Sequence, residues 1–466
     1  MEHAPVQSNI RGSRQDEKSA APSAMPFDKD VIVFTGLFIF SLINGTSLFL
    51  AMLGNAYWLP KKGEGVLKIF IFLSLRSTVA RRFPSIGDTF PSMLKWVVLL
   101  ALAGWMIMRY FVNRDTEKKR INKIVLPLAL FCAFVFLNSM FVSSMPFISL
   151  LKMVSFFIVF FGVLAAVAES YRTFNCLLFF YFVLGIYMLA SAYGFFDRSI
   201  GYSKNVALFN GISNQPNMLG IITAMFFSLT VYLFKNFKGI MRYIGIAGLL
   251  YSILVSYGTA SRTSMAAIAV VSVCAFAFSW VSFQVKLLIF SAAVLLICFV
   301  YPVWGEIWDF LERIIFKSNL ENIFFSRENQ LRGLWDNFLK SPIYGNGFGA
   351  PVLEFKDYRF ATSLPVENGN MFLALFSETG VIGAFLFWIF YLRIIFIGRS
   401  GKGAGMVLPV FVVAISMGEA AFFSVNSIAA MYYILLAAYI FKEEKSSLAG
   451  QDVNRRTLSY SSHNME

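Results

Sequence analysis

Long apolar runs separated by short polar stretches make up most of the chain. Inside a lipid bilayer every backbone N–H and C=O group needs a partner within the protein, so apolar runs of about 20 residues are predicted to be helices. The pattern therefore predicts an all-α polytopic membrane protein with about twelve transmembrane helices. The runs fall near residues 31–53, 93–112, 122–142, 146–168, 174–195, 214–234, 240–258, 263–281, 286–303, 372–397, 406–423 and 425–441.

The polar segments outside these runs divide the chain. Residues 1–30 are polar and mixed in charge and are predicted to be a disordered cytoplasmic tail, with no cleavable leader before the first apolar run. Residues 31–441 form the predicted transmembrane bundle, and 442–466 form a second cytoplasmic tail. The longest polar stretch, 304–371, separates the ninth and tenth predicted helices and is expected to be a large periplasmic loop that carries part of an active site.

Charge in the loops sets the predicted orientation. The loops 113–121, 235–242 and 393–402 each carry three or four Lys and Arg residues, and such loops usually face the cytoplasm. The loop 304–371 has nine acidic and seven basic residues, a net charge of −2 in a chain of +14, and is predicted to lie outside. Both termini are then cytoplasmic, and the protein is expected in a bacterial inner membrane.

One stretch does not fit this orientation. Residues 54–92 are predicted to be outside, although they carry six basic residues. The apolar run 66–75 is too short to span, so it is expected to lie along the membrane interface or to re-enter the bilayer. If it crosses, the topology upstream of it changes. The six basic residues are Lys61, Lys62, Lys68, Arg76, Arg81 and Arg82.

Composition excludes several functions. Hydrophobic residues make up 58% of the chain and charged residues only 14%, whereas soluble domains carry about 25% charged residues. Cytoplasmic loops and anionic lipid headgroups account for the net charge of +14, so no nucleic acid partner is expected. The only histidines are His3 and His463, both in the tails, which argues against a metal site or a histidine base in the bundle. No nucleotide-binding glycine motif follows a strand, and no cofactor is expected.

Arg262 is the first candidate functional residue. It lies in a polar island, residues 258–264, between two apolar runs on the predicted outer side. An arginine near the hydrocarbon usually faces a cavity or a ligand, and its planar guanidinium matches a phosphate group. Ser261, Thr263 and the helix N-terminus that they begin add further donors for an anion. The alternative is an arginine that extends to lipid headgroups.

The predicted outer loop offers a second group. Arg327 and Arg332 could bind a diphosphate or sugar hydroxyls, and the glycines of 341–349 permit a close backbone approach to a ligand. The alternative is a solvated helix with exposed arginines.

Acidic and amide side chains form a third group. Glu367 lies where the outer loop re-enters the membrane and could act as a base. Asn370 lies just before the next helix and Glu378 one or two turns inside it, and both could bind substrate. Asn214 and Asn217 begin another helix on the outer side and could bond sugar hydroxyls. Helix capping and the helix dipole are the alternatives for all five residues.

Four of these segments, in this order and spacing, resemble the O-antigen ligase and O-antigen/exopolysaccharide polymerase superfamily. The resemblance covers about residues 210–390, while the N-terminal half is similar in hydropathy only. The segments are Asn214-Gln215-Pro216-Asn217-Met218-Leu219-Gly220, Ser261-Arg262-Thr263, Ser341-Pro342-Ile343-Tyr344-Gly345-Asn346-Gly347-Phe348-Gly349, and Asn370 through Gly380 to Ile382-Gly383.

The resemblance implies transfer or polymerisation of glycans carried on undecaprenyl diphosphate, on the periplasmic side and without metal or nucleotide. The family's transmembrane arginine corresponds to Arg262 and its loop arginine to Arg327, and both would hold the diphosphate leaving group. Undecaprenyl-diphosphate-linked glycan and membrane lipids are the implied partners, together with a chain-length regulator and a flippase.

Two departures from the family pattern guide the finer prediction. A histidine that many ligases carry before this helix corresponds to Gly369, and an expected tryptophan corresponds to Leu331, with Trp335 one turn later. The missing histidine favours a repeat-unit polymerase, with Glu367 as the nearest candidate base. An O-antigen ligase that transfers glycan to lipid A-core, or a protein O-oligosaccharyltransferase, is the close alternative.

A membrane transporter or a flippase for lipid-linked glycans is the alternative from another class. It predicts two related halves and charges near the middle of the membrane. The chain shows no such repeat, and its polar residues gather at the predicted outer end. Lys152 and Glu419 are further charges inside predicted spans and have no assigned role.

Overall fold

The computed structural model describes residues 29–84, 89–112, 118–203, 206–278, 284, 286, 291, 328–350, 369–397, 404–418, 421–424 and 428–442. Most of the predicted cytoplasmic tails, of the predicted span 286–303 and of the predicted loop 304–371 lies outside the described residues. Arg327, Glu367 and Glu419 are among the residues that are not described.

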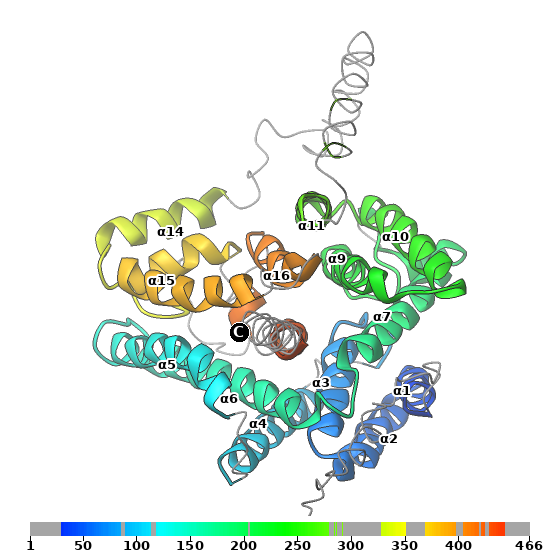
Figure 1. Ribbon diagram of the computed structural model, residues 1–466, viewed down its shortest axis with the longest axis horizontal. Coiled ribbons are helices and arrows are strands. Elements are labelled where there is room, and N and C mark those ends of the chain that lie inside the picture. The colour runs from blue at the N-terminus through cyan, green and yellow to red at the C-terminus, as the bar shows by residue number, and fades with distance from the viewer. Residues whose placement is uncertain are drawn as a thin grey trace, which may run out of the picture.

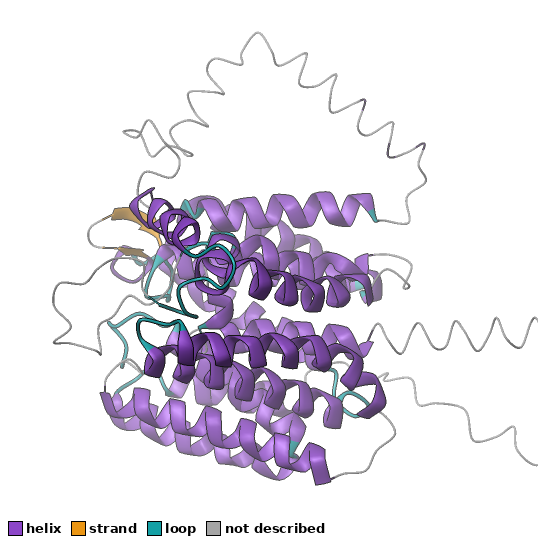
Figure 2. Ribbon diagram, turned by 90° about the vertical axis from the view of Figure 1, so that its left-hand side faces the viewer, coloured by secondary structure: helices purple, strands orange, loops and turns teal. Residues whose placement is uncertain are grey.

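Helices lie side by side in a bundle (Figures 1 and 2). The longer ones are α1 (Lys29–Phe40), α2 (Gly45–Gly54), α3 (Gly63–Ser77), α4 (Thr89–Val112), α5 (Lys118–Phe141), α6 (Pro146–Ser170), α7 (Cys176–Ala192), α9 (Pro216–Leu233), α10 (Ile240–Thr259), α11 (Arg262–Ala277), α14 (Glu328–Lys340), α15 (Met371–Ile397), α16 (Val407–Ser416) and a C-terminal helix, Ala429–Lys442. Short elements are η1 (Asn55–Lys61), η2 (Tyr193–Phe195), α8 (Arg198–Gly201), β1 (Tyr202–Ser203), β2 (Val206–Phe209), η3 (Phe234–Asn236), η6 (Ala404–Met406) and η7 (Ala421–Phe423).

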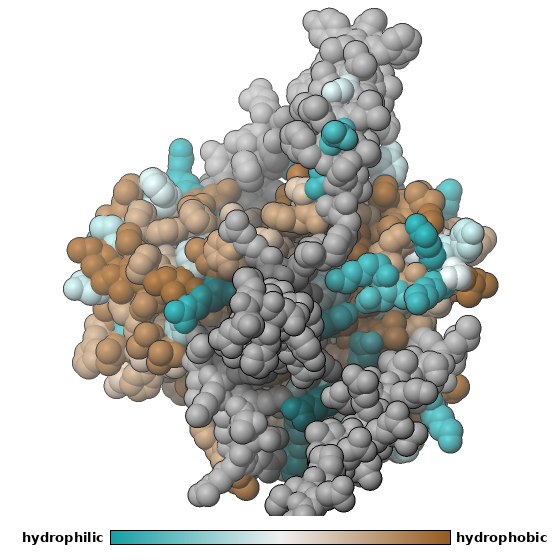
Figure 3. Space-filling view, in the orientation of Figure 1, coloured by the Kyte–Doolittle hydropathy of each residue, from teal (hydrophilic) through white to brown (hydrophobic). Residues whose placement is uncertain are grey.

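The predicted all-α polytopic membrane fold is confirmed. Within the described residues, six helices are long and apolar enough to span a bilayer, and four shorter helices are also apolar. Large apolar side chains such as Phe141, Tyr243 and Phe385 are 79%, 73% and 65% exposed on the outside of the bundle. Figure 3 shows apolar side chains covering its flanks. Such a surface is stable in lipid and not in water.

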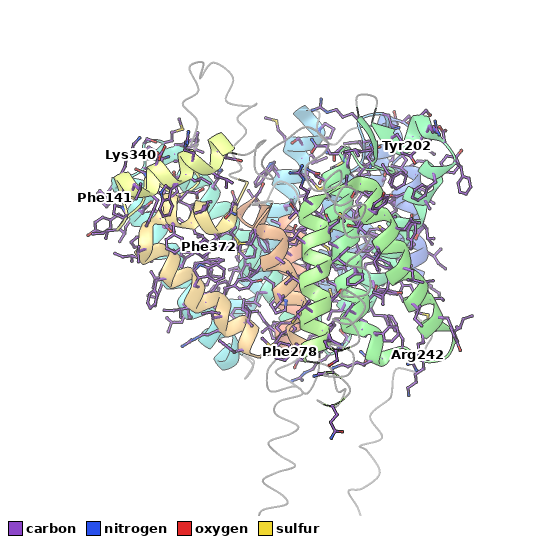
Figure 4. The ribbon with its side chains drawn as sticks, turned by 90° about the horizontal axis from the view of Figure 1, so that it is seen from above. Phe141, Tyr202, Arg242, Phe278, Lys340 and Phe372 are labelled. Atoms are coloured by element: carbon purple, nitrogen blue, oxygen red, sulfur yellow. The ribbon has the colours of Figure 1, made fainter. Side chains whose placement is uncertain are left out.

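The bundle has two distinct ends. Figure 4 places Phe141, Tyr202 and Lys340 at one end, and Arg242 and Phe278 at the other. Phe278 follows α11, so Arg262, the first residue of α11, lies at the end opposite Phe278. We refer to the two ends as the Arg262 end and the Arg242 end. The antiparallel pair β1–β2 and many of the connecting loops gather at the Arg262 end (Figure 2).

The C-terminal helix forms the centre of the bundle (Figure 1). Nine consecutive residues, 428–436, are 0% exposed. Its neighbours come from both halves of the chain: the Tyr433 ring lies 5.1 Å from Phe160 of α6, and the Tyr432 ring lies 6.2 Å from Phe411 of α16, so the two halves share one core.

The predicted first span, 31–53, is wrong. The chain instead forms α1 and α2, because Asn44 begins a new helix within the apolar run. Its side chain accepts a hydrogen bond from the Ser47 amide at 2.8 Å, and the Ser47 hydroxyl accepts one from the Asn44 amide at 2.9 Å. This reciprocal cap fixes a helix start. The helix α2 then runs back along α1, since Lys61 pairs with Asp30.

The helix α3 is buried in the bundle and does not lie along its surface. Thirteen of its fifteen residues are buried. At its start, Gly63 faces Glu169, the end of α6, and beyond its last turn the carbonyl of Thr78 accepts a hydrogen bond from the amide of Asn214. The helix therefore connects the Arg242 end to the Arg262 end. With α1 and α2, it makes three antiparallel passes along the bundle in place of one predicted span, so the start of α1 lies at the Arg242 end.

The path of α1, α2 and α3 explains in part why residues 54–92, which are predicted to be outside, carry so many basic residues. Lys61 and Lys68 return to the Arg242 end, where both pair with Asp30, and Arg109 pairs with Glu169 nearby. The arginines after α3 remain at the Arg262 end.

Candidate active site

The turn between α10 and α11 presents Arg262. Ala260 adopts a left-handed conformation (φ 45°, ψ 34°), which is unusual for a residue with a side chain. Ser261 then begins α11, and its buried hydroxyl lies 2.9 Å from the hydroxyl of Ser264. Arg262 is half-buried in the first turn. A guanidinium at a helix N-terminus, where backbone amides also point outward, favours an anion.

The start of α9 packs directly on this turn. Gly220 has no side chain, and a Cβ atom there would lie 2.7 Å from the Cβ of Ser261. Pro216 occupies the first turn of α9, while Asn214 and Asn217 are exposed at the Arg262 end. Gly220 therefore allows contact between the segments 214–220 and 261–263, which are two of the four segments that resemble the superfamily.

A second set of contacts joins α11 to α15 through the end of α16. A Cβ atom on Gly418 would lie 2.9 Å from the Cβ of Thr263. The side-chain amide of Asn370 donates to the carbonyl of Met417 at 2.9 Å, and its oxygen accepts from the Leu373 amide at 3.0 Å. Asn370 is thus the N-cap of α15, and this cap binds α15 to the residues beside Thr263.

The helix α15 is broken at Gly380, which has φ 64° and ψ −170°. The break leaves backbone groups without partners in the helix. The glycine loop, residues 341–349, supplies them: the Asn346 and Gly347 amides donate to the Ser377 and Glu378 carbonyls, both at 3.0 Å. On the other side of the break, the Val381 amide donates to the Pro342 carbonyl at 2.9 Å. Irregular backbone inside a membrane protein requires such internal partners.

Three glycines shape this loop. Gly345, Gly347 and Gly349 have φ values of 73°, 108° and 65°, a region that favours glycine. A Cβ atom on Gly345 would lie 2.5 Å from the Glu378 carbonyl oxygen, and one on Gly347 would lie 2.5 Å from the Cβ of Ser143. The loop therefore lies tightly between α15 and the α5–α6 turn.

Glu378 and Lys152 hold the end of the glycine loop. The buried Glu378 carboxylate accepts a hydrogen bond from the Gly349 amide at 2.6 Å. The Lys152 ammonium group, from α6, donates to the Gly349 carbonyl at 3.1 Å. The two charges thus bind opposite ends of a glycine residue. In the sequence, Lys152 stands out only as a charge inside a predicted span.

The helix α14 places Arg332 on its exposed surface. Its other face packs on α15, where Leu334 is fully buried and the Phe338 and Phe376 rings lie 5.7 Å apart. The structure therefore gathers Ser261, Arg262, Thr263, Asn370 and the start of α9 at one end, while Glu378 lies about two turns into α15. Arg327 and Glu367, two further predicted site residues, lie outside the described residues.

A bundle of apolar helices with an arginine-bearing turn, a glycine loop and a broken helix at one end defines a polytopic membrane enzyme candidate that handles an anionic substrate. Residues 246–388 match the family model described as O-antigen ligase, which supports the resemblance to the O-antigen ligase/polymerase superfamily. Members of that family are enzymes that transfer glycans, and the match supports a function of that general type. The matched region includes Arg262, the glycine loop and Glu378, but not the start of α9. No curated protein matches the chain.

Proposed function

We propose that this protein polymerises undecaprenyl-diphosphate-linked repeat units into exopolysaccharide or O-antigen at the periplasmic face of the inner membrane. The observation that carries the proposal is the convergence of α9, α11 and the α15 N-terminus around Arg262. Both termini would be cytoplasmic, so the Arg262 end faces the periplasm, where a lipid-linked glycan is available. The basic loop 235–242 supports this orientation, since it joins α9 to α10 near Arg242.

The chemistry needs no metal or nucleotide, because the donor sugar is already activated by its diphosphate. The acceptor hydroxyl oxygen forms a bond to the anomeric carbon of the donor glycan, and the bond from that carbon to the diphosphate oxygen breaks. The hydroxyl proton passes to a base, for which Glu367 is our candidate, and undecaprenyl diphosphate leaves. Arg262 and Arg327 stabilise the growing charge on the diphosphate, with Arg332 assisting.

The remaining candidates position substrates or the residues that touch them. Asn214 and Asn217 are exposed beside the Arg262 turn and can bond sugar hydroxyls, while Ser261 and Thr263 set the turn itself. For Asn370 and Glu378 we propose a refined role: they shape the site by capping α15 and holding the glycine loop. Orientation of two reactants is a large part of catalysis in such a transfer.

The residue before the α15 cap distinguishes polymerase from ligase in this proposal. Gly369 stands where many ligases carry a histidine, and the two histidines of the chain are in its terminal tails. We therefore favour polymerase over transfer to lipid A-core or to a protein.

A deletion strain scored for glycan length tests the proposal. Loss of long chains with single repeats kept on lipid A means polymerase, whereas long chains left on the carrier lipid mean ligase and contradict it. Complementation with the wild-type chain must restore the long glycans.

A further inference from the structure

The segment 78–84 after α3 is basic and is fixed to the start of α9. The Asn214 amide donates to the Thr78 carbonyl at 2.8 Å, and the Ala80 amide donates to the Ile212 carbonyl at 2.9 Å. Between them, Val79 and Ser213 form an isolated antiparallel bridge. The segment is therefore part of the α9 entry and moves with it.

Buried hydroxyl groups support the same junction from inside. The Tyr187 hydroxyl lies 3.0 Å from the Thr78 hydroxyl and 2.7 Å from the Ser213 hydroxyl. All three side chains are buried. A satisfied network of this kind fixes local geometry.

Arg76 lies under the segment and is 1% exposed. Its Nε donates to the Ser41 hydroxyl at 2.9 Å, and its Nη2 donates to the Ser41 carbonyl at 3.1 Å and to the Pro84 carbonyl. Its Nη1 is buried and makes no hydrogen bond within the described residues. No carboxylate there forms an ion pair with Arg76, so its buried positive charge is not neutralised locally.

Arg81 and Arg82 are exposed on the segment itself. Arg82 donates to the Ser199 carbonyl of α8, and no ion pair of either arginine occurs among the described residues. Asp197 interacts electrostatically with Arg82, but its carboxylate caps α8 by accepting from the Ser199 amide at 2.9 Å, and it also accepts from the Ser199 hydroxyl at 2.6 Å. Those hydrogen bonds lower the pKa of Asp197. The segment keeps a net positive charge.

The start of α9 lies between this segment and Arg262. In Figure 1, α9 is placed between α11 and α3. Gly220 contacts the α11 turn, whereas the residues just before α9 pair with the segment. Exposed amide side chains of the α9 start therefore lie between Arg262 and the arginines of the segment 78–84. These amides belong to Asn214, Gln215 and Asn217.

We propose that Arg81 and Arg82 form a second phosphate-binding site, which takes the diphosphate of a second lipid-linked glycan. This rests on the proposed function, because a polymerase joins two substrates that each carry a lipid diphosphate. Arginines on an outer segment oppose the usual charge bias of membrane proteins, and an anionic ligand gives a reason for them. The same phosphate chemistry is offered by anionic phospholipid headgroups, so the test must separate the two sources.

Native mass spectrometry of the full-length protein in detergent, titrated with undecaprenyl diphosphate, counts the bound lipids. We expect two molecules on the wild type and one on R81Q/R82Q at the same concentration, with the second event weakened at least tenfold. One charged hydrogen bond is enough for that change. The matched control is R198Q, an exposed arginine on α8 at the same end, which is expected to bind two.

Three outcomes overturn the proposal: one molecule on the wild type, two on R81Q/R82Q, or displacement of the second molecule by an equal concentration of phosphatidylglycerol. The last would assign the site to bulk phospholipid. If R81Q/R82Q does not fold, R81Q and R82Q are measured singly, and each must weaken the second event. R262Q distinguishes this proposal from the proposed role of Arg262. If R262Q binds two molecules and R81Q/R82Q binds one, the second site is supported and only the diphosphate role of Arg262 is refuted.

Discussion

The Glu378 carboxylate binds the amide of Gly349, 29 residues earlier in the chain, at 2.6 Å. The contact joins the first half of the broken helix α15 to the last glycine of the loop that completes it. Because the loop also satisfies the backbone groups exposed by the break, α15 and residues 341–349 form one structural unit. Any ligand that binds α14 or the loop is thereby connected to α15.

Substitution of Glu378 distinguishes positioning from chemistry. Glu378→Gln keeps an oxygen that can accept from Gly349 and is expected to retain most activity and stability. Glu378→Ala leaves a buried amide without a partner, which costs about 1–3 kcal/mol, and should shorten glycans and lower the melting temperature. Glycan length in a complemented deletion strain and melting of the purified protein measure both effects. Equal loss of activity in the two variants would show that Glu378 acts as an acid, a base or a charged ligand.

Gly380→Ala tests the break in α15. The backbone angles of Gly380 belong to a region that only glycine occupies readily, and a Cβ would lie 2.6 Å from the Tyr344 amide. We expect a loss of about 1–3 kcal/mol from backbone strain, and more from the clash. Gly104→Ala in α4 is the control, because a Cβ there meets no atom within 4 Å. Similar melting temperatures for the two variants would mean that α15 is continuous.

The sequence predicted most helices well, because hydropathy alone determines which segments enter lipid. The predicted span 146–168 became α6 with bounds Pro146–Ser170. The run 372–397 gave no sign of a break, since the partners of the broken backbone come from residues about 35 positions earlier. The Asn44–Gly45 pair inside the first apolar run favours a turn. The hydropathy of the whole run nevertheless led to the prediction of a single helix.

Hydropathy also made part of the candidate site predictable. Arg262 was found because a charge beside an apolar run is unusual. The bond that joins Asn370 to Met417 and the contact of Lys152 with Gly349 are long-range contacts. No local pattern encodes them. Direct substrate contact by Asn370 and Glu378, and the roles of Arg327 and Glu367, stay predictions.

The three antiparallel passes of α1, α2 and α3 along the bundle lead to a topological prediction. Lys62, just before α3, and Arg81, just after it, should be on opposite sides of the membrane. Lys62→Cys is expected to resist a membrane-impermeant maleimide in intact spheroplasts and to react after permeabilisation, while Arg81→Cys should react in both. The wild-type chain controls for its own four cysteines. Labelling of both variants from one side would restore the single predicted crossing.

Arg262→Lys tests the diphosphate role most directly. The substitution keeps a positive charge at the α11 N-terminus but replaces a planar fork by a point charge, so two parallel hydrogen bonds to phosphate oxygens are no longer possible. We expect at least a tenfold loss of long polymer, measured from the glycan length distribution at equal membrane abundance of the protein. The free energy of unfolding should change by no more than about 1 kcal/mol. Arg242→Lys at the opposite end is the matched control and should polymerise normally. Normal polymer from Arg262→Lys would show that this position needs only a charge, and the leaving-group assignment would move to another residue.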